Sequence, residues 1–315
     1  MHPLLSIPLT LAILYRAHHR RSLTSLGLLA AGLTALAHAY HPWSVFYALL
    51  AVFFFSGTAV TKVKHAQKAK LTVSSSGGNN PLVPTPRTSV QVLANSGVAS
   101  VLIVWHAMTL AQLGGEAQTK QGLCLKGLGR GSAATFMDLL PYGIFAQYAA
   151  VAADTFASEL GILSQEQPIL ITDLGALLSF KPKRVPRGTN GGVTILGTLA
   201  GAAGAGLIAL ATAALTPFCG EWTFGGKLSL VIGLTIWGTL GMLLDSVLGG
   251  LLQASVVDVR TGRVIEGDGG LRVQWTKEGQ RQLVSGQDIL DNNGVNFAMA
   301  ATMSVTAILG LWVFT

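Results

Sequence analysis

Two aspartates lie where the surrounding sequence is apolar. Asp245 is flanked by GTLGMLL and SVLGGLLQ, and Asp154 directly follows the apolar run 132–153. A charged side chain inside the hydrocarbon core costs about 2.5–3.5 kcal/mol on insertion scales, so both residues are candidates for function. We expect Asp245 to face protein or a polar cavity. The alternative is an aspartate that only hydrogen-bonds a neighbouring helix.

Helical periodicity decides which polar residues share a face. At 100° per residue, one stripe of the helix around Asp245 holds Gly238, Gly241, Asp245 and Gly249. The glycines let a neighbouring backbone approach this stripe. Glu159 lies about 140° around the helix from Asp154, so both could enter one site only if the helix ended near Ser158. Gly161 makes an end nearby reasonable, and otherwise Glu159 is an exposed charge at the helix end.

The segment from Lys181 to Thr194 joins a basic run to a turn of Gly, Thr and Asn that opens directly into an apolar helix. A helix N-terminus offers unpaired N–H groups and a positive dipole end, so the turn is predicted to bind phosphate. It lacks the GxxxxGK[ST] order of a Walker A loop. The residues with this role would be Lys183, Arg184, Arg187, Gly188, Thr189, Asn190, Gly191, Gly192 and Thr194. The alternative is a basic interfacial loop followed by an ordinary helix cap.

The sequence DILDNNGVN enters the last apolar segment. Asp291 and Asn292 could cap that helix, or their oxygens could bind Mg²⁺. The predicted metal set is Asp154, Asp245, Asp291 and Asn292, and the predicted catalytic acids are Asp154, Glu159, Asp245 and Asp291. Carboxylates from three helices beside a basic phosphate loop predict metal-assisted chemistry on a phosphorylated substrate at the bilayer.

A membrane protein must position these residues. The 315 residues are 50% hydrophobic and 11% charged, against roughly 25% charged residues in soluble domains. A mean hydropathy of +0.53 and 38 glycines fit tightly packed helices in lipid. The net charge of +7 reflects basic loops, and no basic run is interleaved with stacking aromatics, so we expect no nucleic-acid partner. Gly-rich helix faces could also join copies into a homo-oligomer.

Apolar runs near spanning length lie at about 4–15, 23–40, 43–60, 89–112, 132–153, 193–216, 228–254 and 295–314. The first run is short, because a spanning helix needs about 20 residues. The predicted fold is therefore an all-α polytopic bundle of about seven or eight transmembrane helices.

Charge in the loops predicts an orientation. If the loop 16–22 is cytosolic and the helices alternate, seventeen of the 21 Lys and Arg residues lie on the cytosolic side, as the positive-inside rule favours. The candidate polar segments share that side, and we expect the endoplasmic reticulum or another internal membrane. Lys62 and Lys64 could bind an acceptor phosphate there, or only set the topology. Cys124 and Cys219 fall in outer loops, where they either pair in an oxidising lumen or remain thiols.

The chain divides into N-terminal membrane helices (1–60), a basic cytosolic linker (61–88) and a catalytic membrane core (89–315) with cytosolic loops 154–192 and 255–294. SSSGGNNPLVPTP, at 74–86, has the composition of a flexible linker. Weak alternation in 256–259 and 271–275, with turn signals between, predicts a small cytosolic β-hairpin near 255–285.

Several blocks are similar to a known family. ADTFASELG, ILITDLGALLSFKPKRVPRGTNGGVTILG, LLDSVLGGLLQ, ILDNNGVNF and QVLANSGVASVL resemble, in collinear order over about residues 56–300, the transmembrane protein 19 family. That family includes the plant and cyanobacterial phytyl-phosphate kinase of tocopherol synthesis. Its RNW block is Arg87-Thr88-Ser89 here, and its DTWASE tryptophan is Phe156. The DTxAS…GTNGGVT arrangement also looks similar to CTP-dependent polyprenol kinases and phosphatidate cytidylyltransferases.

The resemblance implies an integral membrane protein in the lipid bilayer that transfers a γ-phosphate from CTP or ATP, with Mg²⁺, to a prenyl-phosphate lipid. By the second similarity, Asp154 would match a metal-binding aspartate and residues 183–194 the nucleotide-phosphate loop. Intramembrane carboxylates alone fit an ion- or proton-coupled transporter equally well, and a non-catalytic membrane scaffold is a third alternative. The basic glycine turn favours the kinase, because an ion transporter has no need of a phosphate site.

Overall fold

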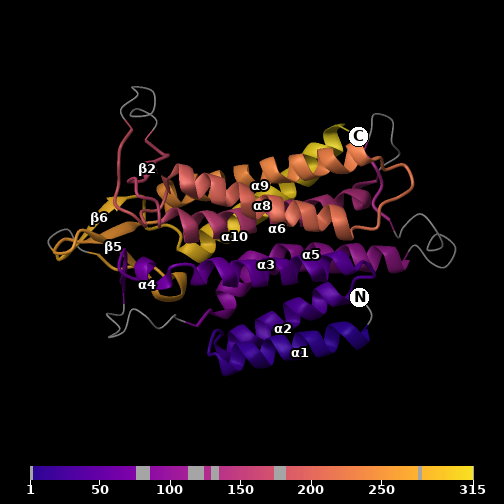
Figure 1. The fold of residues 1–315 in the computed structure, drawn as a ribbon, viewed down its shortest axis with the longest axis horizontal. Coiled ribbons are helices and arrows are strands. Elements are labelled where there is room, and N and C mark those ends of the chain that lie inside the picture. The colour runs from indigo at the N-terminus through magenta and orange to yellow at the C-terminus, as the bar shows by residue number, and fades with distance from the viewer. Residues whose placement is uncertain are drawn as a thin grey trace.

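The computed structural model describes residues 3–75, 86–112, 124–128, 135–173, 182–275 and 279–314. Within these ranges every predicted apolar segment is helical (Figure 1). The long helices are α1 (Pro3–His19), α2 (Ser25–Tyr40), α3 (Ser44–Lys62), α5 (Ser89–Gln112), α6 (Phe136–Gly161), α8 (Ile195–Leu215), α9 (Phe224–Leu252) and α10 (Asn292–Phe314). By length and composition, five described helices could cross a membrane: α3, α5, α8, α9 and α10. The predicted all-α polytopic bundle is confirmed.

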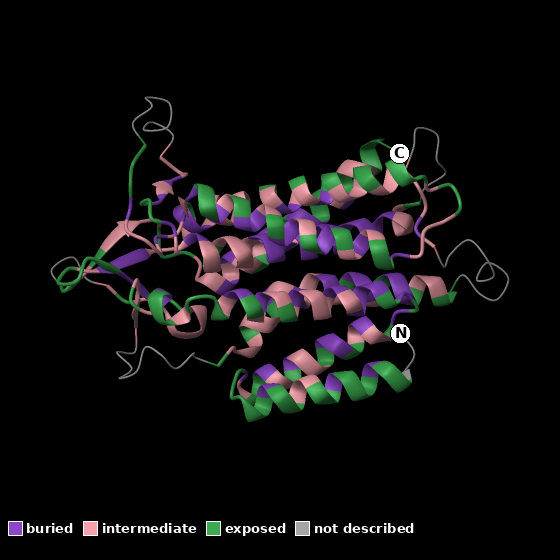
Figure 2. Cartoon of the chain, viewed as in Figure 1, coloured by how far each residue is buried: buried purple, intermediate pink, exposed green. Residues whose placement is uncertain are grey.

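Helix α6 is the centre of the bundle. Its residues from Leu139 to Ala153 are all buried, and α3, α5, α8, α9 and α10 pack against it (Figure 2). An added Cβ at Gly204 of α8 would lie 2.7 Å from the carbonyl oxygen of Ala152, and one at Gly238 of α9 would lie 2.7 Å from that of Ala149. Small residues thus bring three helices to backbone contact, as packing in lipid requires. The predicted protein contact of the α9 glycine stripe is confirmed.

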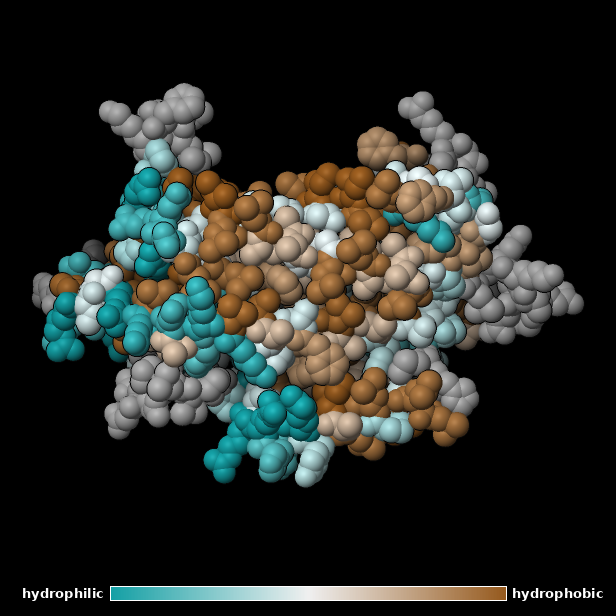
Figure 3. All heavy atoms as spheres, viewed as in Figure 1, coloured by the Kyte–Doolittle hydropathy of each residue, from teal (hydrophilic) through white to brown (hydrophobic). Residues whose placement is uncertain are grey.

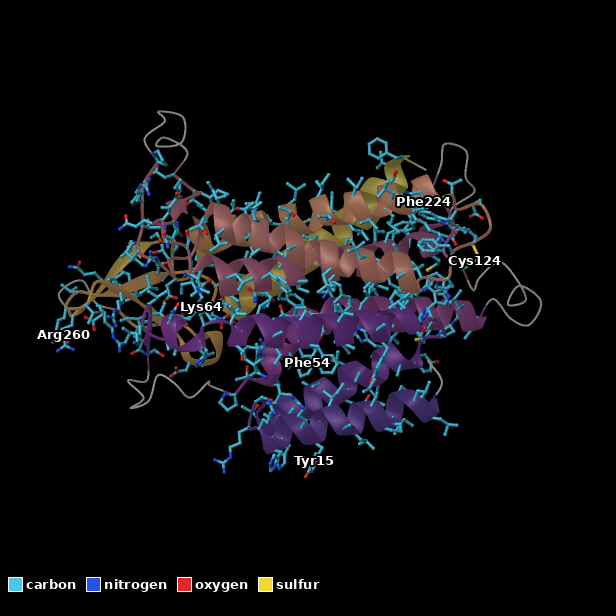
Figure 4. All side chains as sticks on the ribbon, viewed as in Figure 1. Tyr15, Phe54, Lys64, Cys124, Phe224 and Arg260 are labelled. Atoms are coloured by element: carbon cyan, nitrogen blue, oxygen red, sulfur yellow. A yellow bond between two sulfur atoms is a disulfide. The ribbon has the colours of Figure 1, made fainter. Side chains whose placement is uncertain are left out.

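The helices alternate in direction, so their connections gather at two ends (Figure 1). We call one end the polar end. It holds the connections α1–α2, α3–α5, α6–α8 and α9–α10. We call the opposite end, where Cys124 lies, the disulfide end. Figure 4 labels Lys64 and Arg260 at the polar end and Cys124 at the disulfide end. Hydrophilic side chains gather at the polar end, on the left, while hydrophobic ones cover the middle of the molecule (Figure 3).

A disulfide closes the other end of the bundle. Cys124 and Cys219 are bonded, with a Cα–Cα distance of 5.0 Å. The indole nitrogen of Trp222 donates to the carbonyl oxygen of Leu125 at 2.8 Å, which ties the same two connections together. The prediction left two alternatives for these cysteines. The disulfide is confirmed, and the alternative of two free thiols is wrong.

A small sheet lies at the polar end. In spatial order its strands are β1 (Val73–Ser74), β5 (Arg263–Glu266), β4 (Ser255–Asp258) and β6 (Arg281–Ser285). The predicted hairpin near 255–285 is confirmed, but its second strand is wrong, because 271–275 is not a strand and β4 pairs with β5 and β6. The Asp258 carboxylate accepts from the N–H groups of Arg260 and Thr261, and Gly262 has a φ of +66°. The chain therefore turns back directly after β4. Residues Arg263–Glu266 pair with β4 as β5, so the hairpin is complete before Leu271.

The basic segment 61–88 is folded where the structure describes it. Helix α4 (His65–Lys68) follows α3, and β1 pairs in parallel with β5. The predicted linker residues 76–85 lie outside the described residues, as does Lys181. Two further short strands, β2 (Ile169–Leu170) and β3 (Gly192–Val193), pair antiparallel at the end of the basic glycine turn.

Candidate functional site

The carboxyl groups of Asp154 and Asp245 form the centre of the candidate site. Asp154 lies near the polar end of α6, Asp245 lies near the same end of α9, and the two side chains are hydrogen-bonded to each other. Both residues are only partly exposed. Two carboxyl groups form such a bond only when one carries a proton, and a cation between them would take the place of that proton. Asp245 faces protein, as predicted.

The amide of Asn296 adds a third helix to this pair. In the orientation that satisfies its neighbours, its nitrogen donates to Oδ2 of Asp245 at 3.2 Å and to the carbonyl oxygen of Asn292 at 3.1 Å. Sequence reasoning singled out Asn292 and missed Asn296, although the spacing of four residues places both on one face of α10. The site therefore combines oxygen-bearing side chains from α6, α9 and α10.

Asp291 has a different place from the one predicted for a metal ligand. Its Oδ1 accepts from the N–H of Gly294 at 2.8 Å, so Asp291 caps the first turn of α10. Within the described ranges, no three His, Cys, Asp or Glu side chains form a group that could hold a metal ion. The structure thus brings together two of the predicted carboxylates, Asp154 and Asp245, and leaves the third at the helix cap.

Glu159 belongs to a separate cluster because α6 runs unbroken to Gly161. Its carboxylate forms an ion pair with Lys68 of α4 and accepts from the hydroxyl of Thr61 at 2.9 Å. The Lys68 ammonium also donates to the carbonyl oxygens of Val60 and Thr61, at 3.1 and 2.7 Å. Glu159 is therefore not a free charge at the helix end, and it does not share a site with Asp154.

Lys68 was missed by sequence reasoning. It is one of four lysines in the run TKVKHAQKAK, and no local signal separates it from the others. In the structure Lys68 is buried, whereas the predicted acceptor-phosphate residues Lys62 and Lys64 are exposed.

The basic glycine turn packs directly on α9 beside Asp245. Gly191 has a φ of +80°, and an added Cβ there would lie 2.7 Å from the Cα of Gly250 and 3.0 Å from the carbonyl oxygen of Ser246. Only glycine fits this conformation and this contact. The N–H of Asn190 donates to the hydroxyl of Ser255 at 2.9 Å, which fixes the turn to β4 as well.

The other residues of the turn differ in their hydrogen bonds and in their exposure. The Thr194 hydroxyl accepts from Gly197 N at 3.0 Å and caps α8, and the Thr189 hydroxyl donates to the carbonyl oxygen of Pro186 at 2.7 Å. Gly188 has a φ of +84°, and Gly192 donates its N–H to the carbonyl oxygen of Thr189 at 3.0 Å. Lys183 and Arg184 are exposed, and Arg187 is half-buried, with one guanidinium nitrogen donating to the carbonyl oxygen of Gln165 at 2.9 Å. Exposed cations and a helix cap thus belong to the turn whose Gly191 packs on α9 next to Asp245.

A polar layer lies two helical turns deeper in the bundle. Gln147 of α6 is fully buried and donates to the carbonyl oxygen of Asn95 in α5 at 2.9 Å. Among the described residues its amide oxygen has no hydrogen-bond partner. Gln147 lies seven residues before Asp154 and so on the same face of α6.

The sequence matches a known family along nearly its whole length. A family model described as "Integral membrane protein DUF92" matches residues 8–304. The chain belongs to this family. "Protein PGR" of Arabidopsis thaliana is 36% identical over 307 residues, which cover 96% of this chain and 94% of the relative.

A second relative matches a shorter part of the chain. "Uncharacterized membrane protein MJ0933" of Methanocaldococcus jannaschii is 41% identical over 111 residues, or 35% of this chain and 40% of the relative. No solved structure matches the chain. The resemblance to the transmembrane protein 19 family is confirmed, and with it an integral multi-pass membrane protein.

Proposed function

We propose that this DUF92 protein is a membrane-embedded, Mg²⁺-dependent kinase that transfers the γ-phosphate of CTP or ATP to a prenyl monophosphate, giving the diphosphate. The observation that carries the proposal is the Asp154–Asp245 carboxyl pair with the glycine turn packed against the next turn of α9. Phosphoryl transfer depends on positioning and charge neutralisation, and this arrangement can supply both.

The side chains of the pair suit Mg²⁺. Proteins hold this ion by one or two carboxylates, together with water and substrate phosphates. Asp154 and Asp245 would supply the carboxylates, and Asn296, which donates to Asp245, would orient one of them. Bound Mg²⁺ would neutralise charge on the nucleotide phosphates.

The basic turn would hold the phosphates of the nucleotide. Lys183 and Arg184 are exposed and Arg187 is half-buried, so all three side chains are at least partly accessible to a nucleotide. The attacking group is an oxygen of the acceptor phosphate, which is already anionic at neutral pH and needs no strong base. Its bond to the γ-phosphorus forms as the bond to the β-phosphate oxygen breaks, and the nucleoside diphosphate leaves.

A lipid acceptor fits the surroundings of the site. On α9, Leu240 and Leu251 expose large apolar side chains on either side of Asp245 in the sequence. In the proposed orientation the polar end faces the cytosol, where the basic loops belong, and the disulfide end faces an oxidising lumen. An internal membrane such as the endoplasmic reticulum meets both conditions.

The test is a kinase assay on the purified full-length chain. Farnesyl, geranylgeranyl and phytyl monophosphates would each be offered with Mg²⁺ and with ATP, CTP, GTP or UTP. The proposal expects diphosphate from the wild type and a loss of at least about a hundredfold in Asp154→Asn and Asp245→Asn. Asp288→Asn is the matched control, because the Asp288 carboxylate forms an exposed ion pair with Arg272, away from the carboxyl pair in the sequence. Folded wild-type protein that makes no product with any pairing would exclude the kinase.

A hydrogen-bonded carboxyl pair within the helices also suits the second candidate, an ion- or proton-coupled transporter. Flux across proteoliposomes separates the two functions. A flux that is lost in Asp154→Asn and Asp245→Asn, in protein that forms no diphosphate, would favour transport over phosphoryl transfer.

A further inference from the structure

Arg87 is held in place by its backbone at the start of α5. Its N–H donates to the carbonyl oxygen of Ser22 at 2.9 Å, and its own carbonyl oxygen accepts from Thr24 at 3.0 Å. Thr88 and Gln91 then exchange hydrogen bonds in a capping box that begins the helix. Arg87 is thus fixed where the α1–α2 connection meets α5, at the polar end.

The side chain of Arg87 has no hydrogen-bond partner among the described residues. It is half-buried, yet within the described part of the chain its guanidinium forms no hydrogen bond and no ion pair. A guanidinium carries five N–H donors in a fixed planar fork that matches the oxygens of a phosphate. The half-buried guanidinium of Arg87 therefore keeps donors that an anion from outside the chain could use.

Electrostatics around Arg87 leave its charge available. Burial lowers the pKa of Arg87, and the nearby Glu159 partly opposes this effect. Glu159 is itself neutralised by its ion pair with Lys68. Glu266, an exposed acid at the end of β5, interacts with Glu159 and Lys68 and accepts a hydrogen bond from Thr72. Glu159, the acid that acts on Arg87, is therefore already paired with Lys68, and within the described residues Arg87 has no ion pair of its own to compete with an incoming anion.

Apolar side chains are exposed on the two helices that begin beside Arg87. Leu26 of α2 and Val90 and Leu93 of α5 are 67%, 55% and 48% exposed. Gly27 follows Leu26 in the first turn of α2, and an added Cβ there would lie 2.7 Å from the carbonyl oxygen of Arg87. A molecule with a phosphate at one end and a hydrocarbon tail would find both chemistries here.

We propose that Arg87 binds the phosphate group of a phosphomonoester at the polar end, with the guanidinium contacting two phosphate oxygens. The physiological source is a lipid-linked phosphate whose hydrocarbon chain lies along α2 and α5. This assignment rests on the proposed function only for the identity of the lipid as the kinase acceptor. It places the acceptor phosphate at Arg87 rather than at the exposed Lys62 and Lys64.

Binding can be measured without turnover. The full-length chain in phosphatidylcholine nanodiscs, without nucleotide or Mg²⁺, would be titrated with geranylgeranyl monophosphate, geranylgeraniol or inorganic phosphate, and the thermal midpoint followed. We expect Arg87→Gln to weaken binding of the monophosphate by about tenfold to a hundredfold, and Arg87→Lys by less. Arg260→Gln is the matched control, since Arg260 is exposed in the β4–β5 turn and should bind like the wild type.

Several results would overturn the inference. Wild-type affinity for the monophosphate in Arg87→Gln would do so, as would geranylgeraniol binding as tightly as its phosphate. If Arg87→Gln does not fold, unchanged affinity in Arg87→Lys has the same force, because lysine keeps the charge and loses the fork. Binding of inorganic phosphate that depends on Arg87 supports the site and shows that the phosphate is recognised without its tail.

The two proposals fail separately. Monophosphate binding that depends on Arg87, in protein that forms no diphosphate, would exclude the kinase and support this site. An active kinase whose KM for the monophosphate is the same in Arg87→Gln and wild type would exclude this site alone.

Discussion

Gly191 of the glycine turn lies against Gly250 of α9, so closely that an added Cβ on Gly191 would be 2.7 Å from the Cα of Gly250. Ser246, whose carbonyl oxygen is the next atom in this contact, directly follows Asp245 in the chain. The distance between the basic turn and the carboxyl pair is therefore set by two glycine backbones. The three atoms nearest to that added Cβ all belong to the backbone, so no flexible side chain could move aside for it.

Gly191→Ala tests this contact. The substitution meets both an unfavourable φ of +80° and fixed backbone atoms, so we expect a loss of stability of about 2–4 kcal/mol and loss of the proposed kinase activity. Gly262→Ala is the matched control, because Gly262 has a φ of +66° and open space around it. It should lose only about 1–2 kcal/mol and keep activity. Equal losses of thermal midpoint and activity in the two variants would contradict the argument.

Asp154→Asn should separate metal binding from folding. An amide keeps a hydrogen bond to Asp245 without the shared proton, so we expect the thermal midpoint without Mg²⁺ to stay within a few degrees of wild type. Wild type should gain about 1.4 kcal/mol of stability at a Mg²⁺ concentration ten times the Kd, and the variant should gain none. Asp288→Asn should respond like wild type. A Mg²⁺ response that survives in both Asp154→Asn and Asp245→Asn would place the ion elsewhere.

The Lys68–Glu159 ion pair should contribute to stability, because its side chains are only 10% and 26% exposed. Lys68→Met leaves the carboxylate without its partner, and we expect a loss of about 2–4 kcal/mol. The double variant Lys68→Met with Glu159→Leu should recover part of that loss. The ion pair of Arg272 and Asp288 serves for comparison. Its Nε–Oδ1 distance is 3.6 Å and its side chains are 52% and 44% exposed, so Arg272→Met should lower the free energy of unfolding by at most about 1 kcal/mol. Denaturant unfolding of the wild type, the single variants Lys68→Met and Glu159→Leu, and the double variant would measure the coupling, and strictly additive losses would contradict it.

His41 should make stability depend on pH. It lies between α2 and α3, and its Nδ1 accepts from the N–H of Trp43 at 2.9 Å, so Nε2 carries the proton that is shared with His106 at 2.9 Å. Burial, with a smaller contribution from His106, lowers the pKa of His41 from 6.5 to about 2. Between these values the unfolded chain binds the proton and the folded chain does not. Stability from this group is therefore complete above pH 6.5 and falls by about 1.4 kcal/mol per pH unit below it.

Thermal midpoints at pH 7.5, 6.0 and 5.0 would check this dependence. His41→Gln should flatten the acid limb, while His19→Gln, at the exposed end of α1, should leave it unchanged. Identical acid limbs in wild type and His41→Gln would show that His41 does not carry the effect.

Much of the architecture follows from the sequence because hydropathy and turn chemistry act locally. The eight apolar runs predict the helices, the distribution of Lys and Arg predicts the shared end of the polar connections, and Gly161 marks the end of α6. The stripe of Gly238 and Gly241 predicts close contact with a neighbour. These features depend on residues within a few turns of one another, so they can be predicted from the sequence alone.

Tertiary packing decided the contents of the site. The rotation of α6 sends Asp154 to Asp245 and Glu159, five residues later, to Lys68, and no local pattern specifies either partner. The same holds for the disulfide across 95 residues. Lys68 is distinguished from the other lysines of the basic run by its ion pair with Glu159, which lies on α6. The sequence by itself determined which side chains could do chemistry and at which end, whereas the packing of helices remote in sequence determined which of them meet, because contact between distant residues depends on the rotation and approach of whole helices.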